Sequence, residues 1–145
     1  MDMLFIIDPP ESLKEYKDSS IAMMRAAQKR GHQVWFCTPP QLHLWEGRVI
    51  TLATQIDLVP GKNWHAPRDI RTRLLTDFGA ILMRKDPPVD QDYLTATHLL
   101  SLAEEMEGAR IYNRASSLRD FNEKLSIFRF PQFIAPTLVT ATRDL

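Results

Sequence analysis

The chain has 145 residues, which is one domain's worth of chain with room for a real core. Its 18 basic residues balance its 18 acidic residues, so no net field attracts nucleic acid or an anionic membrane. Its apolar runs are too short to span a bilayer. Cys37 is the only cysteine, which excludes an internal disulfide and predicts a reducing, cytoplasmic location. Its place in an apolar run predicts a buried, unreactive thiol.

Short apolar runs predict the strands of a buried sheet. Most of them are stopped by proline pairs, which cannot continue a hydrogen-bonded ladder. The predicted strands are Met3–Ile7, Gln33–Cys37, Ala80–Met83 and Arg110–Asn113, followed by Pro136–Thr140 near the end of the chain. The last of these has little chain left to supply a partner, so we expect the chain to end inside a second domain.

Helical spacing of apolar residues fills the gaps between these strands. The predicted helices are Ile21–Arg30 after the cap residues Asp18, Ser19 and Ser20, a longer helix from the cap Asp90 to Glu107, and a third that starts at Ser116 or Ser117 and carries Leu118, Phe121, Leu125 and Phe128. Gly31 and Gly108 end the first two helices. Because the first helix joins two strands, those strands should lie parallel.

The segment from 42 to 77 interrupts this alternation. Leu42–Trp45 and Arg48–Leu52 flank Glu46-Gly47, which predicts a hairpin that extends the sheet. Pro60–Pro67 is predicted as a loop and Asp69–Leu75 as a short helix. Together the elements predict an α/β fold of three layers, α/β/α, around a mainly parallel sheet of about four to five strands with a hairpin extension.

Charged residues follow directly after the predicted strand Ala80–Met83, at the edge of the sheet where ligands bind in open α/β folds. Arg84 there can present a planar, permanently charged fork to a carboxylate or phosphate, although an ion pair with Asp86 or a neighbour explains it equally. Ser19 and Ser20 place hydroxyls and amides at a helix N-terminus, which favours an anionic group. Plain helix capping is the alternative interpretation of these serines.

The common catalytic motifs are absent. The sequence contains no G-x-G-x-x-G, no G-x-x-x-x-G-K-[ST] and no G-x-S-x-G motif. Its four histidines are scattered without the spacing of metal ligands. The residues therefore predict no catalytic residue and no metal site, only an α/β domain whose strand ends face a ligand.

Four stretches carry a more specific resemblance and together span nearly the whole chain. They are Asp8-Pro9, Lys17-Asp18-Ser19-Ser20-x-Ala22-Met23, Ile81-Leu82-Met83-Arg84-Lys85-Asp86-Pro87-Pro88, and Asn113-x-x-x-Ser117-Leu118-Arg119-Asp120-x-Asn122-Glu123-Lys124-Leu125. In this order they resemble the amino-terminal part of bacterial glutathione synthetases, which are ATP-grasp ligases. The resemblance implies a Rossmann-like pre-ATP-grasp domain over residues 1–120. It also implies that residues 121–145 are the linker helix and first strand of an ATP-grasp domain.

The resemblance also implies a reaction. The family joins γ-glutamylcysteine to glycine with ATP and magnesium, through an acyl-phosphate on the cysteinyl carboxylate. Ser19, Ser20 and Arg84 would then help to hold carboxylate ends of the dipeptide. Lys124 matches the family lysine that reaches ATP phosphates, although a solvated helix lysine is the alternative. Metal ligands of the family have no counterpart in this chain.

Several expectations follow from this resemblance. Most of the ATP and magnesium site would lie in the downstream domain, so the 145-residue chain alone is expected to be inactive. Family members are often homo-oligomers, and we expect the same here. Two other functions remain open: another ATP-grasp ligase that joins a different pair of substrates, and a stand-alone binding domain without ligase activity.

Overall fold

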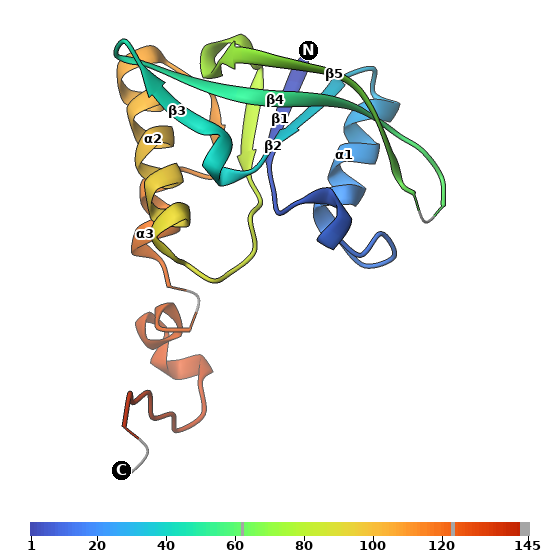
Figure 1. Cartoon of the computed structure of the whole chain (residues 1–145). Helices are drawn as coiled ribbons and strands as arrows, with labels where there is room; N and C mark the ends of the chain where they lie inside the picture. The colour runs from blue at the N-terminus through green and yellow to red at the C-terminus, as the bar shows by residue number, and fades with distance from the viewer. Residues whose placement is uncertain (62, 123, 143–145) are drawn as a thin grey trace.

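The structure is a computed structural model and describes residues 1–61, 63–122 and 124–142. Its strands form a single sheet with helices on both sides (Figure 1). The strands are β1 (Asp2–Ile6), β2 (Gln33–Cys37), β3 (Leu42–Trp45), β4 (Arg48–Leu58), β5 (His65–Leu74), β6 (Ala80–Met83) and β7 (Ile111–Tyr112). The helices are α1 (Ser19–Lys29), α2 (Gln91–Glu107) and α3 (Ala115–Asp120), with short 3-10 turns at Pro10–Ser12, Pro39–Gln41, Leu75–Asp77, Ser126–Arg129 and Pro131–Phe133.

The sheet is half parallel and half antiparallel. Its order is β3-β4-β2-β1-β6-β7, and β5 pairs with β4 off this path. β1 is parallel to β2, as the βαβ pattern predicts. β1 is also parallel to β6, and β6 is parallel to β7. The pairs β2–β4, β3–β4 and β4–β5 are antiparallel. The predicted α/β class is confirmed, whereas a mainly parallel sheet of four or five strands is only partly right.

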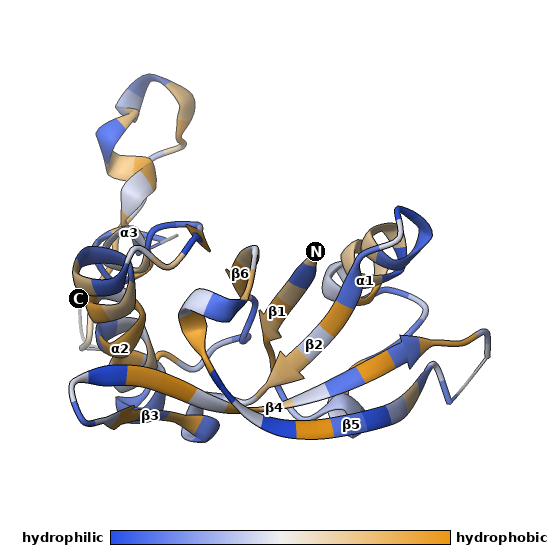
Figure 2. Ribbon diagram, turned by 90° about the horizontal axis from the view of Figure 1, so that it is seen from above, coloured by the Kyte–Doolittle hydropathy of each residue, from blue (hydrophilic) through white to orange (hydrophobic). Residues whose placement is uncertain are grey.

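The core lies on both faces of β1, because alternate side chains of a strand point to opposite faces. Leu4 and Ile6 pack with α2 in one buried cluster, and Phe5 and Ile7 pack with α1 in the other. A strand buried on both faces needs a continuous apolar run, which explains the sequence of β1 and its apolar colour in Figure 2. The helices therefore flank the sheet on opposite sides.

Local caps set the ends of the two long helices. The Asp18 carboxylate accepts hydrogen bonds from the backbone N–H groups at the start of α1, and the Asp90 carboxylate accepts one from Tyr93. Gly108 ends α2 in a left-handed conformation with φ of 74°, which glycine adopts without steric cost. The predicted bounds of these helices are confirmed to within two residues. Within the described residues, no helix has both the length and the apolar character needed to cross a membrane.

The region from Pro60 to Leu75 was predicted only in part: the described residues up to Trp64 form the expected loop, but a strand follows from His65. β4 continues to Leu58, and the chain returns as the antiparallel strand β5, so the short helix expected over Asp69–Leu75 is wrong, and this segment is a strand up to Leu74. No side chain of β5 is buried, and the strand is rich in charge. Among the described residues it pairs only with β4. An edge strand of this kind is held by its backbone ladder, so its side chains carry little strand signal.

The C-terminal segment also differs from expectation. α3 ends at Asp120, so the predicted helix through Phe128 is wrong, and the described residues up to 142 contain no strand at Pro136–Thr140. Figure 1 shows this segment leading away from the sheet, and Phe121, Leu125 and Phe128, which were expected to line a helix, are about half exposed. An apolar stripe orders a helix only when it packs on something. Glu123 and residues 143–145, which belong to the predicted linker and strand, lie outside the described residues.

Candidate functional site

The topology of the sheet predicts a ligand-binding crevice between the ends of β1 and β6. From β1 the chain passes through α1 to β2 on one side, and from β6 it passes through α2 to β7 on the other side. The two crossover helices therefore cover opposite faces, and the direction of winding reverses between β1 and β6. In open α/β sheets, ligands bind at this switch point, outside the carboxyl ends of the strands.

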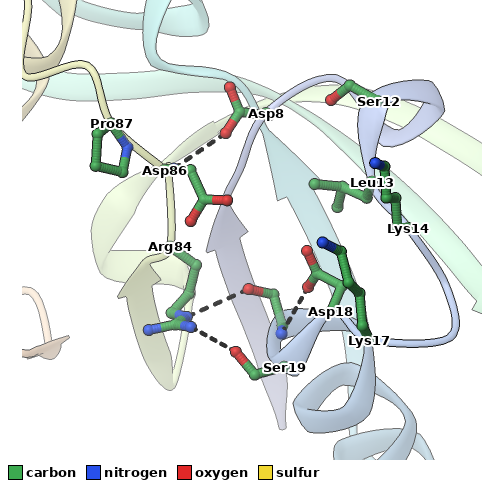
Figure 3. Close-up of a pocket in the computed structure, with 11 residues that line it drawn as sticks. Asp8, Ser12, Leu13, Lys14, Lys17, Asp18, Ser19, Arg84, Asp86 and Pro87 are labelled. Carbon is green, nitrogen blue, oxygen red and sulfur yellow. Dashed lines mark hydrogen bonds between the residues drawn. The ribbon is translucent and has the colours of Figure 1, made fainter.

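A pocket of about 500 Å³ lies at this point (Figure 3). Its walls come from three places: the segment after β1, the N-terminus of α1 and the segment after β6. The lining includes the cations Lys14, Lys17 and Arg84 and the acids Asp8, Asp18 and Asp86. The pocket is thus strongly polar and carries both signs of charge.

Arg84 is held in this pocket by two hydroxyl groups. Its Nη2 donates to Ser19 Oγ at 2.8 Å, and its Nε donates to Ser20 Oγ at 3.2 Å. The predicted residues Ser19, Ser20 and Arg84 are therefore brought together, although more than sixty residues separate the serines from the arginine in the chain. Among the described residues Arg84 forms no ion pair, so the alternative of a strand-end pair with Asp86 is not seen.

Helix capping and arginine binding are divided among neighbouring residues. Asp18 caps α1, because its Oδ1 accepts from Ser20 N at 2.7 Å and from Ile21 N at 3.1 Å. The hydroxyls of Ser19 and Ser20 are then available to Arg84. The side chains of both serines therefore contact Arg84 and do not cap the helix.

A second set of contacts joins the ends of β1 and β6, and sequence reasoning did not find it. Lys85 Nζ lies 2.9 Å from Asp8 Oδ1, and Asp8 Oδ2 accepts from Asp86 N at 3.0 Å. Lys85 also donates to the carbonyl oxygen of Asp86. The sequence Asp-Pro-Pro follows both strands. It indicates contacts between the two strand ends only once β1 and β6 are known to be neighbours.

Lys124 lies elsewhere. It lines a separate pocket of about 690 Å³ with Arg114 and Arg119, and Pro87 borders both pockets. Its backbone N–H donates to Asn122 Oδ1 at 2.9 Å. Burial raises the pKa of Tyr93 in this second pocket, and the charge of Lys85 partly offsets that effect. The role of Lys124 stays a prediction.

Metal ligands are not gathered in the part of the chain that the structure describes. No group of three or more His, Cys, Asp or Glu side chains there is arranged to hold an ion. Cys37 is fully buried, as its apolar run predicts, and burial raises the pKa of its thiol to about 12. The His, Cys, Asp and Glu side chains of the described residues therefore do not fit a magnesium site.

Comparison with known proteins decides the family. The model of the prokaryotic glutathione synthetase N-terminal domain matches residues 1–119. The chain belongs to this family. It is 47% identical over 141 residues to a glutathione synthetase of Ralstonia nicotianae, a match that covers 97% of this chain and 43% of that protein. The family to which the motifs pointed is therefore confirmed.

Other members of the family give a consistent picture. A glutathione synthetase of Neisseria meningitidis is 44% identical over 145 residues, which cover 97% of this chain and 45% of that protein. One of Prochlorococcus marinus is 45% identical over 141 residues, which cover 97% of this chain and 44% of that protein. The chain thus spans less than half the length of these relatives.

Proposed function

We propose that the chain acts as the amino-terminal substrate-binding domain of a glutathione synthetase, an ATP-dependent ligase that joins the cysteinyl carboxylate of γ-glutamylcysteine to the amine of glycine. The observation that carries the proposal is the Arg84 fork, set by Ser19 and Ser20 at the switch point of a chain that belongs to this family. A guanidinium that has no carboxylate partner among the described residues is suited to bind a carboxylate of the dipeptide.

The surroundings of Arg84 support an anionic ligand group. Lys14 and Lys17 line the same pocket as Arg84, whereas two of its three acids are already engaged, Asp8 by Lys85 and Asp18 by the start of α1. The N-terminus of α1 adds the partial positive charge of its macrodipole beside Ser19 and Ser20. Arg84 is held by Ser19 and Ser20 before a ligand arrives, which lowers the entropic cost of binding.

We assign the nucleotide and the metal mainly to residues beyond this chain. The described residues do not fit magnesium, and Lys124 is our candidate for contact with ATP phosphates because Arg114 and Arg119 line the same pocket. We propose that residues 1–120 form the substrate domain and that 121–145 lead into an ATP-grasp domain. We further propose a cytoplasmic homo-oligomer for the whole enzyme.

Calorimetric titration of the chain with γ-glutamylcysteine tests the proposal. We expect binding, and we expect Arg84→Met to weaken it by about tenfold to a hundredfold, because a charge-assisted carboxylate contact is lost. Arg71→Met is the matched control, since Arg71 is exposed on β5 and lies outside the pocket. The absence of binding, or equal loss in both variants, would contradict the proposal. Preference for another peptide would indicate a related ATP-grasp ligase instead.

A further inference from the structure

Asp86 lines the Arg84 pocket with a held backbone and a carboxylate that has no partner among the described residues. The backbone of Asp86 is held at two points, by Asp8 Oδ2 at its N–H and by Lys85 at its carbonyl oxygen. Its carboxylate forms no ion pair with another described residue, and Figure 3 shows the side chain projecting into the pocket. The carboxylates of Asp8 and Asp18, by contrast, accept hydrogen bonds from the protein itself. Asp86 therefore presents a negative charge to whatever enters.

Arg84 and Asp86 carry opposite charges in one pocket without pairing. They are two residues apart and line the same space, yet they form no ion pair with each other, and the guanidinium donates to Ser19 and Ser20 instead. The backbone contacts of Asp86 and the hydroxyl contacts of Arg84 keep the two charges apart. A ligand that carries both signs at close range satisfies both residues together.

The opposite charges of Arg84 and Asp86 restrict the chemical class of ligand that fits this pocket. A phosphate or another dianion would gain from Arg84, Lys14 and Lys17 but would be repelled by Asp86, which has no cationic partner among the described residues. A simple carboxylate would leave Asp86 without a partner. An α-amino-acid head has a carboxylate and an ammonium on one carbon atom, so it matches a guanidinium and a carboxylate that face a common space.

We infer that this pocket recognises the α-amino-acid head of the γ-glutamyl end of the dipeptide, with Arg84 on the α-carboxylate and Asp86 on the ammonium. The inference rests on the proposed function and adds the orientation of the substrate. The reacting cysteinyl carboxylate lies at the other end of the dipeptide and is not held by Arg84. Asp86 is then a specificity-determining residue, because it selects ligands that carry an ammonium.

Two ligands that differ only in the ammonium test the inference. The chain is titrated calorimetrically with γ-glutamylcysteine and with glutarylcysteine, which lacks the α-amino group. We expect γ-glutamylcysteine to bind about tenfold to a hundredfold more tightly, the usual worth of a charge-assisted contact. Asp86→Asn should remove most of this difference by weakening γ-glutamylcysteine alone, whereas Asp69→Asn on β5, outside the pocket, should leave it in place.

The outcomes separate the inference from the proposed function. Equal affinity of the two ligands for the unmodified chain would overturn the orientation and leave the proposed function standing. Equal weakening of both ligands by Asp86→Asn would overturn the role of Asp86. If neither ligand binds, both the inference and the proposed function are wrong. The comparison of ligands on the unmodified chain needs no variant to fold.

Discussion

Glu107 ties the β3–β4 hairpin to the end of α2, and its removal should destabilise the fold measurably. Its Oε1 accepts from Val49 N at 2.7 Å, and its Oε2 accepts from Arg48 Nε at 2.8 Å. An acidic residue in the last turn of a helix is disfavoured by the helix macrodipole. The hydrogen bonds from Arg48 and Val49 of the hairpin offset this unfavourable interaction with the macrodipole.

The expected loss follows from these two contacts. The Glu107 side chain is only 7% exposed and that of Arg48 is 50% exposed, so the ion pair is partly screened and contributes about 0.5 kcal/mol. The bond from Val49 N–H weakens by roughly 1 kcal/mol when its acceptor becomes neutral. Glu107→Gln should therefore lower the free energy of unfolding by about 1–2 kcal/mol. The midpoint of thermal unfolding should fall by about 3–6 °C.

The pH dependence gives a second, independent signature. Burial alone would raise the pKa of Glu107, but hydrogen bonds from Arg48 and Val49 and the charge of Arg48 lower it below its ordinary value. A carboxyl group with a lowered folded-state pKa stabilises the fold fully above its unfolded-state pKa, about 4.3 for glutamate. That contribution is lost as the pH falls through the folded-state pKa. The difference between wild type and Glu107→Gln should therefore shrink below about pH 4.

Urea unfolding followed by tryptophan fluorescence measures both effects. Glu105→Gln is the matched control, because Glu105 lies exposed in the same turn, and it should change stability by less than about 0.5 kcal/mol. Equal unfolding free energies of wild type and Glu107→Gln at pH 7 would refute the reasoning. So would a difference that stays constant between pH 7 and pH 3.

Three further predictions concern the cap, the thiol and turnover. Asp18→Ala should lower the free energy of unfolding by about 1 kcal/mol, because two N–H groups of α1 lose their acceptor, and Asp18→Asn should recover most of it. An unchanged unfolding curve for Asp18→Ala would count against the cap. Cys37 should react with a maleimide at pH 8 more than about a hundredfold slower in the folded chain than in urea, since burial raises its pKa to about 12. Fast labelling of the folded chain would show that the thiol is accessible. The 145-residue chain should show no ligase turnover with ATP, glycine and γ-glutamylcysteine, and magnesium-dependent ADP release above a no-protein blank would contradict this.

Sequence alone determined the elements whose signals are local. An apolar run stopped by Asp8-Pro9-Pro10 specifies β1, because such a run is stable only when it is buried on both faces. Asp18 and Asp90 mark the starts of α1 and α2, because a cap bonds to N–H groups two or three residues away. Arg84, Ser19 and Ser20 were also singled out from sequence, since strand ends and helix starts are where such folds expose polar groups, and their binding role stays a prediction.

Only the tertiary structure decided the elements that depend on distant partners. β5 carries charged and exposed side chains, and it is a strand because the backbone of β4 offers it a ladder. The pocket contacts of Asp8, Lys85 and Asp86 exist because β6 pairs with β1 across more than seventy residues of chain. The periodicity of apolar residues indicates which face of a single helix or strand is buried. Strand pairing and contacts between charged side chains depend instead on which elements become neighbours. That choice is made by the packing of the whole sheet and its helices.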